Sequence, residues 1–149
     1  MSLKNKIDQE IKQAMLSKEK ERLTVLRAIK SQILLAQTEK GASDEITEES
    51  ELKLLTKAAK QRKESAEIFQ KEGRDDLYSK EIFEYEVISQ FLPKQLSDQE
   101  LEKEVKSIIE ETGASEMKDM GKVMGIASKK LAGKADGKKI SEQVKKLLA

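Results

Sequence analysis

The residues best suited to chemistry in this chain lie between positions 121 and 140, which read GKVMGIASKKLAGKADGKKI. This stretch holds four of the seven glycines and six lysines against a single acidic residue. Lysine ammonium groups attract phosphate, and glycine lets a ligand approach the backbone closely, so the composition suits a polyanion. An ordinary solvated lysine surface would have the same composition, and the residues alone leave both interpretations open.

The candidate nucleic-acid-binding residues are the six lysines of this stretch and the glycine that ends its first helix. They are Lys122, Lys129, Lys130, Gly133, Lys134, Lys138 and Lys139. The last two lie in the first turn of the final expected helix, where cations oppose the helix dipole. An external anion, bound by the first-turn N–H groups and the lysines, would offset that cost.

Two further glycines, Gly121 and Gly125, are spaced to lie on one face of an expected helix. Each costs about 1 kcal/mol relative to alanine in a helix interior. Close packing of another helix is one explanation for this cost. The approach of an RNA backbone or a partner protein is the other.

The composition excludes several kinds of catalytic site. The chain has no histidine and no cysteine, which removes the commonest general base, the thiolate nucleophile and zinc sites built on these residues. No glycine-rich phosphate loop of the GxxxxGK[ST] type is present. The acidic pairs at positions 48–49 and 75–76 suit helix starts. We therefore expect no catalytic residues, no metal and no cofactor.

The overall composition predicts a helical protein with an aliphatic core. Among 149 residues, 38% are charged, 37% are hydrophobic and 3% are aromatic. No segment approaches the roughly 20 apolar residues of a membrane span, and no apolar signal segment opens the chain, so we expect a cytoplasmic protein. The net charge of +1 hides blocks of opposite sign: residues 97–116 are strongly acidic and residues 117–149 strongly basic.

The first half of the sequence predicts four helices. The first follows Ser2, and apolar residues at helical spacing reach Met15. The second spans about residues 20–40 and carries a stripe that Leu34 and Leu35 widen, which predicts a mostly buried helix that Gly41 ends. The third runs from the N-cap Thr47 to Gly73. The fourth runs from residue 75 or 76 towards Pro93.

The second half predicts three shorter helices. Ser97 and Glu100 form a capping-box pattern, and Gly113 ends the helix that they begin. The next spans about residues 117–131, and Asp136 caps the last. No segment alternates with period two. We therefore predict an all-α protein in which a four-helix, bundle-like domain (residues 1–92) precedes a small three-helix domain (97–149), with a hinge at 93–96.

Three segments of this sequence resemble the YqeY-like family. They are LPKQLSDQEL (92–101), DMGKVMGIASKKLAGKADGKKISEQV (119–144) and the basic helix ERLTVLRAIKSQI (21–33). YqeY-like proteins are in turn similar to the C-terminal tail region of GatB, a subunit of the glutamine-dependent aminoacyl-tRNA amidotransferase. The resemblance covers nearly the whole chain.

The resemblance implies an all-helical fold of two parts and a link to tRNA transamidation. It carries the family label of a carbon–nitrogen ligase with glutamine as amido-N-donor, but the residues indicate only a binding piece. We expect a tRNA-binding module, with tRNA as the partner and an amidotransferase or synthetase as a further partner protein. The alternative is a protein–protein adaptor in translation or amide metabolism, which the blocks of opposite charge suit equally well.

Overall fold

The computed structural model describes residues 2–39 and 46–149, and this part of the chain is all-helical, as predicted. Seven α-helices and one short 3-10 helix follow one another there, with no strand among the described residues. Their bounds are α1 (Leu3–Leu16), α2 (Lys20–Glu39), α3 (Glu48–Lys71), α4 (Asp75–Ser89), α5 (Asp98–Thr112), η1 (Met117–Asp119), α6 (Met120–Lys130) and α7 (Gly137–Leu148). The chain divides into two compact units, residues 1–92 and 93–149.

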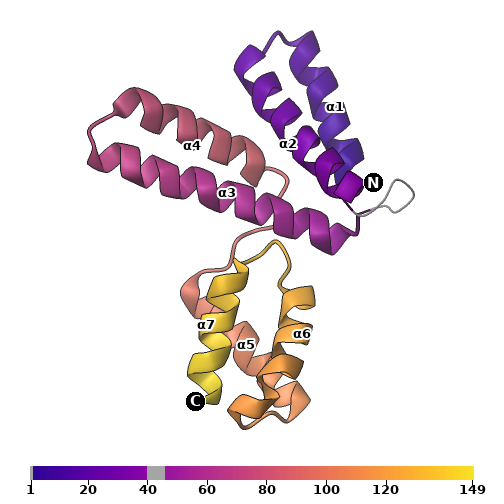
Figure 1. Cartoon of the computed structure of the whole chain (residues 1–149), viewed down its shortest axis with the longest axis vertical. Helices are drawn as coiled ribbons and strands as arrows, with labels where there is room; N and C mark the ends of the chain where they lie inside the picture. The colour runs from indigo at the N-terminus through magenta and orange to yellow at the C-terminus, as the bar shows by residue number, and fades with distance from the viewer. Residues whose placement is uncertain (1, 40–45) are drawn as a thin grey trace. The chain divides into compact units, whose positions relative to one another are not determined.

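The first unit consists of two antiparallel helical hairpins. Figure 1 shows α1 beside α2 and α3 beside α4, with the first pair crossing the second instead of lying along it. Arg22 joins three of these helices, because its guanidinium contacts Glu10 on α1 at 2.7 Å and the side-chain oxygen of Gln90, just after α4, at 2.8 Å. The predicted four-helix part therefore has the form of crossed hairpins.

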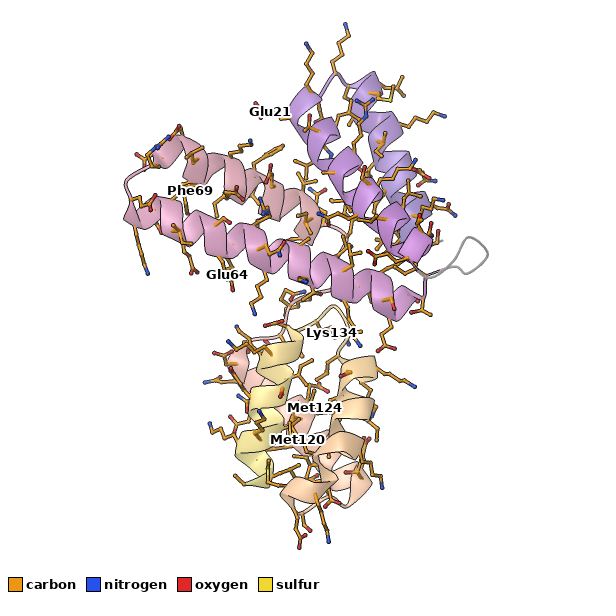
Figure 2. The ribbon with its side chains drawn as sticks, viewed as in Figure 1. Glu21, Glu64, Phe69, Met120, Met124 and Lys134 are labelled. Carbon is orange, nitrogen blue, oxygen red and sulfur yellow. The ribbon has the colours of Figure 1, made fainter. Side chains whose placement is uncertain are left out.

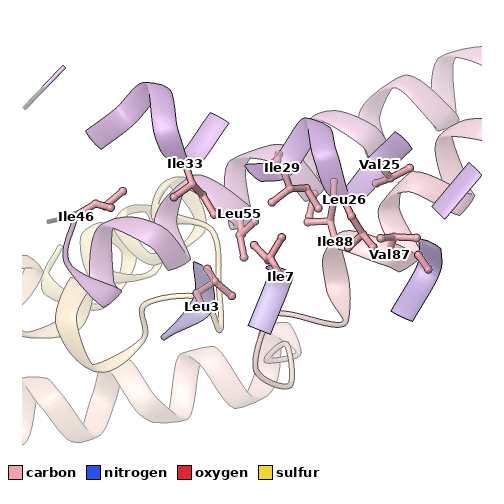
Figure 3. Close-up of a cluster of buried hydrophobic side chains, with 13 residues drawn as sticks. Leu3, Ile7, Val25, Leu26, Ile29, Ile33, Ile46, Leu55, Val87 and Ile88 are labelled. Atoms are coloured by element: carbon pink, nitrogen blue, oxygen red, sulfur yellow. The ribbon is translucent and has the colours of Figure 1, made fainter. Parts of the chain in front are cut away.

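One aliphatic cluster holds the two hairpins together (Figure 3). Ile7 of α1, Leu26 of α2 and Leu55 of α3 have no exposed surface, and Ile88 of α4 packs with them. Burying a side chain of this size contributes about 1.5–3 kcal/mol relative to leaving it in water. The core thus lies where the hairpins cross.

The predicted burial of α2 is only partly correct. Val25, Leu26, Ile29 and Ile33 are buried as one stripe, but Leu34 is 40% exposed and Leu35 61% exposed. A helix that crosses its neighbours is covered mainly near the crossing, so a wide apolar stripe need not be buried along its whole length. The prediction for Leu34 and Leu35 was wrong for this reason.

The local start and stop signals of the helices are largely confirmed. The hydroxyls of Ser2, Thr47 and Ser97 each accept a hydrogen bond from an N–H in the first turn of the following helix. Gly73 and Gly113 adopt the left-handed conformation that ends a helix, with φ of 71° and 69°. The predicted stop at Gly41 lies outside the described residues.

The second unit packs α5, α6 and α7 around a second aliphatic cluster. Val105 of α5, Val123 of α6 and Val144 of α7 have no exposed surface, and Leu131 packs with them. These positions recur at helical spacing, so each helix presents its apolar stripe inward and its lysines and glutamates outward. The candidate lysines lie on the exposed side of α6 and α7 and in the link between them.

Candidate nucleic-acid interface

The candidate residues centre on the short link between α6 and α7. Figure 1 shows these two helices antiparallel, and Figure 2 places Lys134 in the link, at the end of α6 away from Met120. Gly133 is buried and has φ of 77°, a left-handed conformation that side-chain-bearing residues rarely adopt. This turn lets the chain leave α6 and begin α7 within a few residues.

The segment just before α5 fixes the shape of this link. The side-chain amide of Gln95 donates to the carbonyl of Gly133 at 2.6 Å and to that of Pro93 at 3.0 Å. The backbone N–H of Leu96 donates to the carbonyl of Lys134 at 2.9 Å. Residues 95 and 96 are thus anchored within the second unit. The sequence gives no sign of the Gln95 contact, because its partner lies 38 positions away.

The six candidate lysines differ in whether an acidic residue already pairs with them. Lys130 contacts Glu111 at 2.8 Å, and Lys139 contacts Asp98 at 3.8 Å. Lys129, Lys134 and Lys138 are exposed and have no ion-pair partner within 4 Å in the described part of the chain. Within the ranges that the structure describes, three ammonium groups without an ion pair therefore lie on the last turn of α6, in the link and on the first turn of α7.

Lys122 stands apart from the other lysines. Lys129 lies seven positions further along the helix, which is about 10 Å along the axis. Its neighbour is Asp119, whose pKa is lowered by hydrogen bonds from the N–H groups of Ser115 and Glu116 and, to a smaller extent, by the charges of Lys118 and Lys122. The structure thus places Lys122 near the start of α6 and the remaining lysines at or beyond its end.

The two helical glycines face open space. A β-carbon added at Gly121 or Gly125 would meet nothing within 4 Å among the described residues. Both glycines are exposed, so helix packing within the described chain does not explain them.

Helix α7 begins directly after the link, at Gly137. Asp136 is at the N-cap position with extended backbone, and its carbonyl accepts the first helical hydrogen bond, from the N–H of Ile140 at 3.1 Å. No acidic residue lies in the first turn, which carries Lys138 and Lys139 instead. The positive end of the helix dipole and these two ammonium groups therefore act in the same direction on an anion.

The described residues contain neither a candidate metal site nor a candidate membrane-spanning helix. Across residues 2–39 and 46–149, no group of three or more carboxylates is placed to hold a metal ion. In the same ranges, no helix has both the length and the hydropathy that crossing a membrane requires.

Comparison with known protein families places this sequence in one of them. The sequence pattern described as Yqey-like protein matches residues 4–148 of this chain. No curated protein sequence matches it significantly.

Proposed function

Since this chain belongs to the YqeY-like protein family, we propose that it is a tRNA-binding module linked to glutamine-dependent tRNA transamidation. In this proposal the chain has no catalytic site of its own. The link between α6 and α7 binds the sugar–phosphate backbone of the tRNA. The observation that carries the proposal is a set of three lysines, Lys129, Lys134 and Lys138, near a helix N-terminus and without an ion-pair partner among the described residues.

These groups suit phosphate better than they suit bases. Lysine is a compact point charge, and it neutralises phosphate without reading sequence. The first-turn N–H groups of α7 add directional donors. Gly121 and Gly125 leave the exposed face of α6 without side-chain bulk, which lets a backbone lie close to Lys122 and Lys129. Binding is therefore salt-dependent and depends on the shape of the RNA more than on its sequence.

Lys130 and Lys139, which already pair with carboxylates, bind phosphate at little cost in free energy. Both members of the Lys139–Asp98 pair are more than half exposed, and so are Lys130 and Glu111. Exposed ion pairs of this kind are worth about 0–1 kcal/mol, so exchange of a carboxylate for a phosphate is easily offset.

The decisive experiment measures binding of the full chain to bulk tRNA by fluorescence anisotropy across a salt series, with duplex DNA as the comparison. We expect tRNA to bind more tightly, with log affinity falling linearly as log salt rises. The variant Lys134→Glu with Lys138→Glu should lose most of the affinity. It should also reduce the magnitude of the salt slope by about two, because two phosphate contacts are removed.

The matched control is Lys145→Glu with Lys146→Glu. These lysines lie on the last turn of α7 and are exposed, so the charge change is the same but the link is untouched. The control should keep most of its affinity. Equal losses in the two variants would show that only net charge matters and would remove the link as the site.

The adaptor function makes a different prediction from the same protein. If the acidic α5 and the basic α6 and α7 served only to dock another protein, neither tRNA nor DNA would bind at low salt. A third function is amidotransferase activity of the chain itself, and it is tested with glutamine, ATP and misacylated tRNA. Amide formation by the chain alone would contradict a module without a catalytic site.

A further inference from the structure

The crossed hairpins of the first unit leave an open cleft between α2 and α4. Its volume is about 450 Å³, and Val25 and Phe83 contribute its apolar floor. Phe83 is partly buried and also packs against the main cluster. Glu21, which Figure 2 labels at the start of α2, lines the cleft from one helix, and Asp76 near the start of α4 lines it from the other.

This cleft continues along α2 as a groove. A second hollow of about 230 Å³ shares Thr24, Val25 and Glu84 with the cleft. A third, of about 270 Å³, shares Gln32, Ala58 and Gln61 with the second. From Glu21 to Glu39 the groove follows about 27 Å of helix, at a rise of about 1.5 Å per residue. A groove of this length suits a helix better than a small molecule.

Small, apolar and acidic side chains line different parts of the groove. Ala28 and Ala58 line its middle, where a partner backbone can lie close. Leu35, which is 61% exposed, provides an apolar wall at the far end. At the wide end the lining carries three carboxylates, Glu21, Asp76 and Glu84, against one ammonium group, that of Lys80.

Among these carboxylates, Glu21 has no ion-pair partner in the described part of the chain, whereas Glu84 contacts Arg62 at 3.3 Å. Asp76 contacts Arg74 at 3.6 Å, but both side chains are more than half exposed. A backbone hydrogen bond from Leu77 and the charge of Arg74 lower the pKa of Asp76, so this carboxylate is ionised at neutral pH. Lys80, Arg62 and Arg74 thus balance these three carboxylates in number, and Glu21 is the one of the three without an ion-pair partner among the described residues, beside an apolar floor.

We propose that this groove is a docking site for an amphipathic helix of a partner protein, with a basic side chain between Glu21 and Asp76 and apolar side chains on Val25, Phe83 and Leu35. The mode is that of a helix laid into a hydrophobic groove, with anchors one or two turns apart. Glu21, which has no ion-pair partner among the described residues, disfavours a phosphate beside it. The site is separate from the lysine-bearing link and does not depend on it.

The test uses a synthetic helix of about 18 residues with leucine and alanine on one face and arginine on its flanks. It is titrated into the full-length, ¹⁵N-labelled protein. We expect amide shifts concentrated in α2 and α4, around residues 21–35 and 76–84. The variant Glu21→Lys with Asp76→Lys should raise Kd by about tenfold or more, because it replaces attraction with repulsion at the wide end.

A second variant tests the shape of the groove without changing its charge. Ala28→Trp fills the middle hollow from an exposed position, so the fold is retained and Kd should again rise about tenfold. The matched charge control is Glu64→Lys with Glu67→Lys. Both residues are exposed on α3 and line none of the three hollows, so Kd should change little.

Three results would overturn the proposal. The first is no shift in the groove at millimolar peptide. The second is equal binding of the same peptide with glutamate in place of arginine. The third is displacement of the peptide by tRNA together with tRNA-induced shifts in α2 and α4, which would make the groove an RNA site. Peptide binding that survives Lys134→Glu with Lys138→Glu would support a site independent of the lysines.

Discussion

Glycines in this chain serve two different purposes, and the difference is visible residue by residue. Gly113 and Gly133 have positive φ and end helices, a role that their missing β-carbon makes possible. Gly121 and Gly125 have ordinary helical backbone and open space around them. The first pair is required by the fold. The second pair weakens α6 without any packing contact in return within the described chain.

This distinction predicts opposite effects of the same substitution. Gly121→Ala and Gly125→Ala should each stabilise the second unit by about 0.5–1 kcal/mol, because alanine favours the helix and meets no neighbour. Gly113→Ala should destabilise it by about 1 kcal/mol or more, since alanine is strained at positive φ. Urea unfolding measures both.

The same variants also bear on binding. If a phosphate backbone lies over α6, Gly121→Ala with Gly125→Ala should weaken tRNA binding while raising the urea midpoint. A stabilised variant with unchanged tRNA affinity would show that nothing approaches the glycines closely.

At the scale of helices, the sequence correctly predicted the features that depend only on residues nearby in the chain. The caps at Thr47 and Ser97 and the stops at Gly73 and Gly113 are local hydrogen-bond and dihedral effects, so their signals are read from a few residues. The exposure of Leu35 was mispredicted, because it depends on the angle at which one hairpin crosses another. The candidate lysines were found by composition, but which of them are already paired was not.

Gln95 makes a contact that local sequence patterns cannot reveal, and this contact can be tested. Gln95→Glu keeps the size of the side chain but removes both donors, which leaves the carbonyls of Gly133 and Pro93 facing a carboxylate. We expect this variant to loosen the link between α6 and α7 and to weaken tRNA binding several-fold. Hydrogen exchange of residues 131–137 and anisotropy measure the two effects.

The control for this prediction is Gln99→Glu, which adds the same charge at an exposed position on the first turn of α5. Its exchange rates and tRNA affinity should stay near those of the parent. If Gln95→Glu matched this control in both measurements, the hydrogen bonds of Gln95 would not be what holds the link.

For the molecule as a whole, the two separate aliphatic clusters set the pattern of stability. Leu55 belongs to one and Leu131 to the other, and each is almost completely buried. Truncating either to alanine should cost about 2–5 kcal/mol, because it removes buried methyl groups and leaves a cavity.

We expect each loss to stay within its own unit. In native-state hydrogen exchange, Leu55→Ala should lower protection in the described residues up to 92 and leave 93–149 near the parent, and Leu131→Ala should do the reverse. Equal losses across both units from either variant would mean that the chain unfolds as a single cooperative body.

The hydrogen bonds of Gln95 and Leu96 have a consequence for the reach of the chain. Because these residues are anchored to the link between α6 and α7, only residues 93 and 94 separate them from the first unit, roughly 7 Å when extended. So short a tether would keep the local concentration of one bound partner high around the other. A helix bound to the first unit and an RNA bound to the second would then stay close to each other as long as both are bound.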